Sequence, residues 1–212
     1  MNLPNKITLT RIFMIPVFVA VFYCGYFSKW CFLASAVVFL LAAATDALDG
    51  YIARSRHLVT NFGKFLDPIA DKVLVSTALI VILTIPTAFQ IAVYGTVGII
   101  VAGVCVSLIL ARELIVSGFR IIAAGRNLIL AADKLGKIKT VTQDLAIALI
   151  LVAMTFVGTQ AGIVLALIGQ ALLVVSTLLT VVSGVNYLVK NKAVLKDEEP
   201  QTAEKQDGEQ EN

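Results

Sequence analysis

Six apolar segments dominate this chain and leave few folds open to it. Each is about 20 residues or longer, the length that a helix needs to cross a hydrocarbon core roughly 30 Å thick. Of the 212 residues, 58% are hydrophobic and 15% charged, whereas soluble domains carry roughly 45–50% apolar and about 25% charged residues. We therefore expect an all-α, polytopic integral membrane protein with six transmembrane helices, over about residues 7–26, 30–52, 65–85, 91–122, 138–157 and 161–188.

The basic residues indicate how these segments are oriented. The connections near residues 25–30, 85–92 and 157–163 contain one basic residue between them, Lys29, whereas the alternate connections hold clusters of lysine and arginine. Basic loops stay on the cytoplasmic side, so we expect both termini there. Residues 191–212 carry three lysines against seven acidic residues and no aromatic residue, a composition typical of a disordered tail. The expected organisation is a six-helix membrane domain over residues 1–190 followed by this acidic cytoplasmic tail.

Four aspartates lie near the cytoplasmic ends of the second and third apolar segments. Asp46 and Asp49 are spaced i, i+3, and Asp67 and Asp71 are spaced i, i+4, so each pair shares one face of a helix. Carboxylates in membrane-spanning helices are costly and usually face a functional cavity. The loop between the two segments is short, which predicts neighbouring helices and four carboxylates that converge in one cavity open to the cytoplasm.

A cluster of this kind suits a divalent metal and a phosphate ligand. Donor sets made only of oxygen favour Mg²⁺, Mn²⁺ or Ca²⁺ over zinc, and two such metals can clamp both oxygens of a phosphoryl displacement. Gly50 and Ala53 leave room for a phosphate near the backbone, although close helix packing explains small residues equally well. Arg54 offers a fork of donors, Gly63 leaves room at a helix N-terminus, and Thr60 supplies a hydroxyl.

Residues 46–71 follow the pattern D-x2-D-G-x2-A-R-x8-G-x3-D-x3-D. This pattern resembles the signature of the CDP-alcohol phosphotransferase family. Those enzymes have a six-helix fold, transfer a phosphatidyl or similar group from a CDP-linked donor to an alcohol, and release CMP. The resemblance implies that the four aspartates bind two divalent cations, Mg²⁺ or Mn²⁺, and that Asp71 accepts the proton of the acceptor hydroxyl. It also implies a homodimer, and contacts to the CDP part of the donor from Gly50, Arg54 and Thr60.

A second group of charged residues bears on the identity of the acceptor. Basic residues end the fourth segment and begin the fifth, and those we expect to bind an acceptor phosphate are Arg112, Arg120, Lys137 and Lys139. An uncharged acceptor would not need them. The tendency of basic residues to stay on the cytoplasmic side accounts for such lysines as well. It accounts less readily for Arg112, which lies deeper in an apolar run beside Glu113.

Further short motifs resemble one bacterial branch of the family. Residues 2–11, the Arg112-Glu113 pair and residues 136–140 are similar to members that transfer phosphatidyl from CDP-diacylglycerol to sn-glycerol 3-phosphate. The resemblance covers residues 2 to about 188 and implies a location in the bacterial cytoplasmic membrane, in contact with membrane lipid. Other acceptors, such as inositol phosphate, serine or phosphatidylglycerol, would use the same chemistry.

Two other classes of function fit the sequence poorly. A divalent-cation transporter would also carry carboxylates within its spans, but it needs polar groups along the depth of the membrane, and here the outer halves of the segments are apolar. Nucleic-acid binding is not expected, because the basic residues follow membrane sidedness and lack interleaved aromatic residues.

Overall fold

The computed structural model describes residues 3–55, 61–90, 95–125 and 134–192, with side-chain detail for 9–45, 69–70, 72–89, 95–123 and 135–192. Every regular element within these ranges is helical, which confirms the predicted all-α class. The elements in chain order are α1 Leu3–Tyr23, the 3-10 turn η1 Cys24–Tyr26, α2 Trp30–Ser55, α3 Asn61–Leu83, α4 Thr87–Gln90, α5 Thr96–Gly125, α6 Lys134–Thr155 and α7 Gln160–Lys190.

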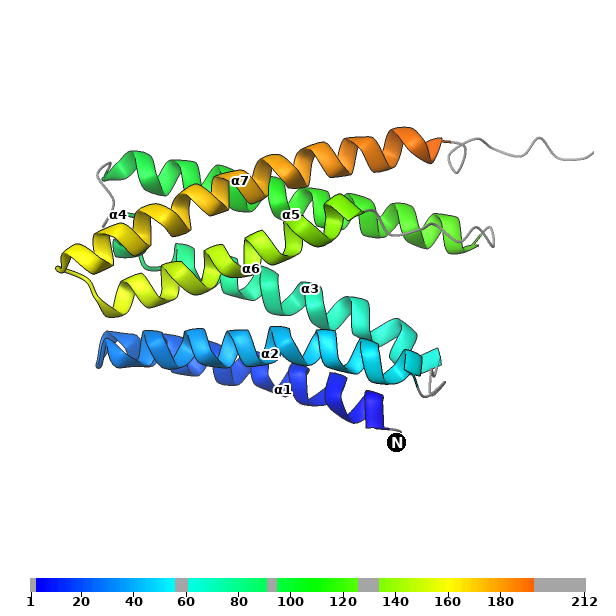
Figure 1. The fold of residues 1–212 in the computed structure, drawn as a ribbon, viewed down its shortest axis with the longest axis horizontal. Helices are drawn as coiled ribbons and strands as arrows, with labels where there is room; N and C mark the ends of the chain where they lie inside the picture. The colour runs from blue at the N-terminus through cyan, green and yellow to red at the C-terminus, as the bar shows by residue number, and fades with distance from the viewer. Residues whose placement is uncertain (1–2, 56–60, 91–94, 126–133, 193–212) are drawn as a thin grey trace, which may run out of the picture.

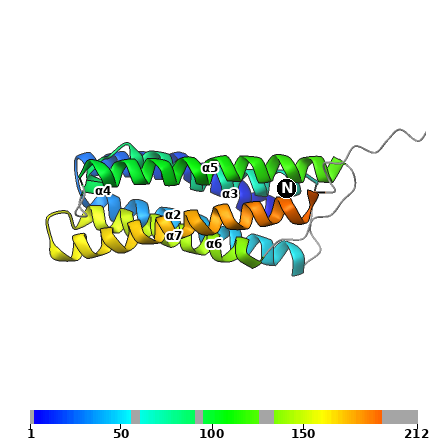
Figure 2. The same cartoon turned by 90° about the horizontal axis from the view of Figure 1, so that it is seen from above.

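The long helices form an elongated bundle with two layers (Figures 1 and 2). One layer contains α1, α3 and α5, and the other contains α2, α6 and α7. Helices α1 and α2 pair across the layers at one side of the bundle, and α5 pairs with α7 at the other. The start of α1 and the end of α7 lie at the same end of the bundle, as do the end of α2 and the start of α3.

Aromatic rings and small residues together pack the interior. The ring of Phe18 lies 6.1 Å from that of Phe39, and the rings of Phe22 and Phe32 are 5.5 Å apart; together these contacts join α1 to α2. Helices α6 and α7 make the most extensive contact in the bundle. At Gly169 a methyl group would come within 2.8 Å of Ile150, so the absence of a side chain there permits the close approach. Small residues serve this purpose widely in membrane helices.

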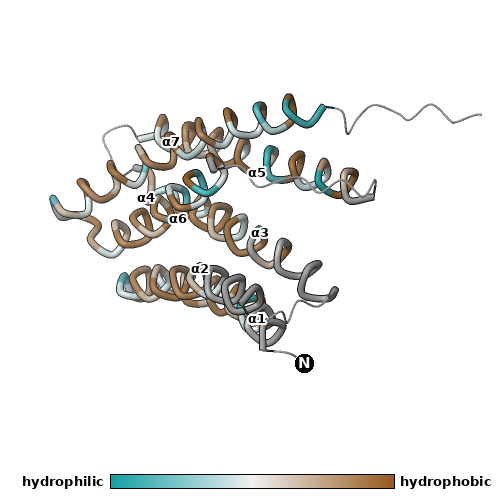
Figure 3. The backbone as a smooth tube through the Cα atoms, turned by 45° about the vertical axis from the view of Figure 1, so that its right-hand side comes forward, coloured by the Kyte–Doolittle hydropathy of each residue, from teal (hydrophilic) through white to brown (hydrophobic). Residues whose placement is uncertain are grey.

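The long helices are apolar along much of their length, with polar residues mainly near the helix ends (Figure 3), and many of their large apolar side chains are exposed. Within the part of the chain whose side chains are described, four helical stretches are long and apolar enough to cross a bilayer: Leu9–Tyr26, Thr96–Ala123, Leu135–Thr155 and Gln160–Lys190. Among the residues with described side chains, α2 and α3 contribute shorter apolar stretches, Trp30–Thr45 and Lys72–Leu83. These helices are those of an integral membrane protein, while the count of six spans stays a prediction.

Several helix boundaries differ from the prediction. Helix α1 begins at Leu3 rather than near residue 7, because Pro4 falls in its first turn, where a missing backbone N–H costs no hydrogen bond. The fourth long helix, the 30-residue α5, begins at Thr96 rather than near residue 91, and the short α4 lies before it, in the predicted connection near residues 85–92. Gly95, just ahead of α5, has a φ of +48°, which glycine adopts readily. Residues 91–94 lie outside the described residues.

Candidate active site

The signature aspartates lie on two helices that contact each other. Asp46 and Asp49 lie in the last third of α2, and Asp67 and Asp71 lie in the first half of α3. The helical backbone confirms that each pair shares a helix face, and the contact between α2 and α3 confirms that the two helices are neighbours. The side chains of these four residues lie outside those described, so their convergence stays a prediction.

The residues expected to contact the donor lie on the same two helices. Gly50, Ala53 and Arg54 occupy the last two turns of α2, and Gly63 lies in the first turn of α3. Thr60 falls outside the described residues, as do the side chains of the other four. The backbone thus brings most of the signature to one end of the bundle (Figure 1), and the roles of the individual residues stay predictions.

This arrangement fits a pair of hard divalent cations. The two neighbouring helices contribute four carboxylates and no histidine, and their single cysteine, Cys31, lies near the other end of α2 from the aspartates. Oxygen-only sets of this kind suit Mg²⁺ or Mn²⁺. Asp46 lies nine residues before the end of α2, which places it about 14 Å along the helix from that end at a rise of roughly 1.5 Å per residue. The backbone positions of the four aspartates therefore lie within about 15 Å of the end of α2 or the start of α3.

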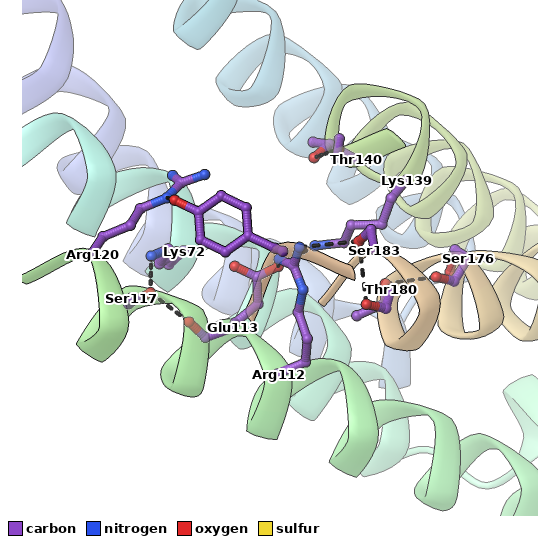
Figure 4. A network of polar contacts seen from close by, with 12 residues as sticks. Lys72, Arg112, Glu113, Ser117, Arg120, Lys139, Thr140, Ser176, Thr180 and Ser183 are labelled. Atoms are coloured by element: carbon purple, nitrogen blue, oxygen red, sulfur yellow. Dashed lines mark hydrogen bonds and ion pairs between the residues drawn. The ribbon is translucent and has the colours of Figure 1, made fainter. Parts of the chain in front are cut away.

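A network of charged side chains begins one residue after Asp71 (Figure 4). Lys72 on α3 donates a hydrogen bond to the hydroxyl of Ser117 on α5, and that hydroxyl donates in turn to the backbone carbonyl of Glu113. The carboxylate of Glu113 accepts from the ammonium of Lys139 on α6. Three helices are thereby joined through polar contacts in an otherwise apolar interior.

Arg112 extends the network to the fourth helix, α7. Its Nη1 lies 3.2 Å from Oε1 of Glu113, and its Nη2 donates to Oγ of Ser183 at 3.1 Å. A methyl group at position 184 would come within 2.8 Å of Cγ of Arg112, so Gly184 provides the room in which the arginine lies. The guanidinium is thus fixed by a carboxylate on its own helix and a hydroxyl on the next.

A cavity of about 50 Å³ opens beside this network, enough for a few water molecules. Its lining residues come from α3, α5 and α6: Lys72, Val75, Ser76, Leu79, Ile109, Leu110, Glu113, Lys139, Thr140 and Gln143. Gln143 is 2% exposed, and its Oε1 has no hydrogen-bond partner among the described residues. A buried amide oxygen without a partner costs free energy, so this side chain is suited to a polar ligand in the cavity.

The charges around the cavity favour an anion. Lys72 and Lys139 line it, Arg112 contacts Glu113 at its edge, and Glu113 is the one carboxylate of this group. Among the side chains of this group that the structure describes, three positive charges and one negative charge give a net charge of +2. A phosphate monoester carries up to two negative charges near neutral pH, so its charge matches that of the group.

The four basic residues expected to bind an acceptor phosphate are not brought together. Lys139 lines the cavity and Arg112 lies beside it, whereas Lys137 is exposed. Arg120 instead pairs with Tyr187 on α7: its Nε donates to the phenolic oxygen at 3.2 Å, and its Cζ lies 5.3 Å from the ring centroid. Arg120 and Lys137 are thus separated from the cavity lining.

Sequence reasoning missed Lys72 and Gln143. Lys72 follows Asp71 directly in an apolar helix, and a charged residue in such a position is itself a signal of function. Gln143 offers no comparable signal, because its importance depends on which face of α6 meets α3 and α5.

Comparisons with known proteins agree with the signature. The family model described as CDP-alcohol phosphatidyltransferase matches residues 1–184. The chain is similar to the CDP-diacylglycerol–glycerol-3-phosphate 3-phosphatidyltransferase of Bacillus subtilis (strain 168), with 40% identity over 92% of this chain and 97% of the relative. Proteins of the same name from Rickettsia felis and Salmonella typhimurium are 36% and 34% identical, over 88% and 93% of this chain and 93% and 98% of their own lengths. The resemblance drawn from the aspartate pattern is thereby confirmed, and the chain belongs to the CDP-alcohol phosphatidyltransferase family.

Proposed function

We propose that this protein transfers the phosphatidyl group of CDP-diacylglycerol to sn-glycerol 3-phosphate and releases CMP. The relatives that cover nearly the whole chain carry the name of this reaction. The observation that carries the choice of acceptor is the positive charge of the cavity, which Lys72, one position after Asp71, and Lys139 line and beside which Arg112 lies. A phosphorylated acceptor would balance that charge, whereas free inositol or serine would leave most of it unbalanced.

The four aspartates would hold the divalent cations. When bound, Mg²⁺ or Mn²⁺ supplies positive charge that neutralises the diphosphate of the donor and stabilises CMP as the leaving group. Gly50, Ala53 and Gly63 leave space for the donor near the backbone. Arg54 and Thr60 are the donors of hydrogen bonds to its CDP part.

Asp71 would act as the general base. It accepts the proton of the acceptor hydroxyl as that oxygen forms a bond to the β-phosphorus of the donor and the bond from this phosphorus to the CMP oxygen breaks. A carboxylate that binds cations is a weak base, but a positioned and polarised hydroxyl can still transfer its proton to it. The product is phosphatidylglycerophosphate.

The cavity cations would place the acceptor for this step. Lys72 and Lys139 bind the phosphate of glycerol 3-phosphate, and the amide of Gln143 offers a polar partner to the same ligand. Consecutive residues of a helix project about 100° apart, so Asp71 and Lys72 can contact different parts of one small acceptor. Arg120 and Lys137, which lie apart from the cavity, would attract the anionic acceptor from water.

We further propose that the site opens to the cytoplasm of a bacterial cell, with both termini on that side of the membrane. The alternation of basic and nearly uncharged connections supports this orientation, as does the position of the start of α1 and the end of α7 at the same end of the bundle (Figure 1). The family resemblance also supports a homodimer, which the molar mass of the detergent-purified protein would test.

The decisive experiment is an acceptor panel. Purified protein is incubated with CDP-diacylglycerol and Mg²⁺, and CMP release is measured with glycerol 3-phosphate, inositol 1-phosphate, inositol, serine or phosphatidylglycerol. Release that requires glycerol 3-phosphate is the expected result. Release with only another acceptor would retain the chemistry and refute the role of the cavity, and folded protein that releases CMP with none would refute the proposed reaction. Lys29→Gln, an exposed position at the opposite end of the bundle, serves as the control variant.

A further inference from the structure

A buried arginine on α1 has no part in the site described so far. Arg11 is 0% exposed and lies in a largely apolar helix, where a buried charged residue is unexpected. The charge pattern of the sequence counts it only among the basic residues of the cytoplasmic side. A buried guanidinium is strongly unfavourable without an opposite charge, and arginine stays charged at any accessible pH. Arg11 therefore requires a carboxylate inside the bundle.

Few carboxylates are available to it. Among the long helices, α1 makes its main contacts with α2 and α3. These two helices contain four acidic residues in all, and they are the four aspartates of the signature: Asp46, Asp49, Asp67 and Asp71. Of the other acidic residues with described side chains, Glu113 on α5 is already bonded to Lys139 and Arg112, and Asp144 lies on α6, which is not among the main contacts of α1.

The register of the helices leads to the same residues. The ring contacts of Phe22 with Phe32 and of Phe18 with Phe39 fix how α1 runs antiparallel to α2. Continued along α1, which contains Pro16, this pairing places Arg11 level with residues 43–46 of α2, the turn that includes Asp46.

The position of α1 against α3 is fixed in the same way. The hydroxyl of Tyr23 lies 3.2 Å from that of Thr84, and α1 and α3 run in the same direction. The equivalent position to Arg11 on α3 is then the turn that includes Asp71. Helical side chains lean toward the N-terminus of their helix, which directs a side chain at position 11 toward the end of the bundle where Asp49 and Asp67 lie.

We propose that Arg11 is a positioning residue of the aspartate site, because the register brings its position on α1 beside the positions of the four aspartates on α2 and α3. The proposal rests on the proposed role of the aspartates in binding cations. The planar guanidinium can bond two carboxylate oxygens at once, which fixes the rotamer of an aspartate and reduces the mutual repulsion of the four. Mg²⁺ accepts only near-octahedral ligand geometry, so the order imposed by Arg11 sets the affinity of the site for the cation.

The test measures Mg²⁺ binding separately from turnover. Protein purified in detergent and stripped with EDTA is titrated with Mg²⁺, and the rise in melting temperature is followed for the wild type, Arg11→Gln, Arg11→Lys and the control Lys29→Gln. The Mg²⁺ concentration that gives half-maximal CMP release is measured alongside, together with KM for glycerol 3-phosphate.

Arg11→Gln is expected to require about 10–100-fold more Mg²⁺ in both titrations, the usual effect of removing a group that orients metal ligands. KM for glycerol 3-phosphate at saturating Mg²⁺ should stay close to the wild-type value. Arg11→Lys keeps the positive charge but loses the planar group that can bond two carboxylate oxygens, so it should require less additional Mg²⁺ than Arg11→Gln. The control Lys29→Gln should match the wild type.

Wild-type Mg²⁺ dependence in both Arg11 variants would overturn the proposal while leaving the metal site intact. If Arg11→Gln does not fold, the same result in Arg11→Lys alone overturns it. A wild-type protein that shows no Mg²⁺-dependent shift would overturn the metal site itself and, with it, the role of Arg11.

Discussion

Replacing Glu113 with glutamine tests how far the ion pairs between helices stabilise the bundle. The side chain of Glu113 is 19% exposed, and those of its partners Lys139 and Arg112 are 6% and 17% exposed, so water screens these charges poorly. Removal of one partner from a buried pair costs about 3–5 kcal/mol, because the remaining charge stays buried. Glutamine keeps one oxygen that can accept from Lys139. We therefore expect the free energy of unfolding to fall by about 3 kcal/mol, the lower end of that range.

The measurement is a double-mutant cycle in detergent micelles. Unfolding is followed by circular dichroism for Glu113→Gln, Lys139→Met and the double variant. Removal of both charges of a buried pair in favour of an apolar group is often nearly neutral, so the double variant should recover most of the stability lost in Glu113→Gln. Lys29→Gln, an exposed single-charge change, should stay within about 0.5 kcal/mol of the wild type.

Two results would refute this reasoning. A loss of less than about 1 kcal/mol in Glu113→Gln would show that the pairs behave like exposed ones. Strict additivity of the two single changes would show that Glu113 and Lys139 are not coupled, whatever their separation in the structure.

Four further outcomes are expected. Asp71→Asn should reduce CMP release at least about 100-fold, as for the loss of a general base, while equilibrium binding of CDP-diacylglycerol to the purified protein is retained. Lys72→Met should raise KM for glycerol 3-phosphate by about 10–100-fold, since a hydrogen bond to a charged group contributes about 1.5–3 kcal/mol; steady-state kinetics should show KM for the donor little changed. Gly184→Ala should displace Arg112, whose Cγ would lie 2.8 Å from the new methyl group, and lower the free energy of unfolding in micelles by about 1–3 kcal/mol. EDTA should abolish CMP release, and added Mg²⁺ should restore it; release unaffected by EDTA would contradict a metal-dependent reaction.

Hydropathy predicts which segments are helical, because an apolar segment that lies in hydrocarbon must satisfy its own backbone hydrogen bonds and does so as a helix. It predicts their ends less well, since a helix continues into water after its apolar residues end. Helix α3 starts at Asn61 rather than at residue 65, and α6 starts at Lys134 rather than at residue 138. In both cases a polar first turn precedes the apolar segment.

Some features of the site can be predicted from neighbouring residues in the sequence, whereas others depend on contacts between distant residues. The spacing of the aspartates is local, so the helical pairing of Asp67 and Asp71 follows from the sequence. The cavity depends on which faces of α3, α5 and α6 meet, and spacing alone does not determine that. Arg120 illustrates the difference: its partner Tyr187 is 67 residues away, and no pattern near position 120 indicates the contact.

Helix α3 carries Asp71 and Lys72 at consecutive positions, with Ala70 and Leu74 buried in the interior beside them. In the proposed reaction a single rigid rod therefore supports both the proton acceptor and a ligand of the incoming substrate. Rotation of this rod about its axis would displace both groups together, so looser acceptor binding and slower turnover would arise from the same movement. Substitutions that enlarge or shrink the buried face of α3, far from any substrate, should accordingly change kcat and KM for glycerol 3-phosphate in step.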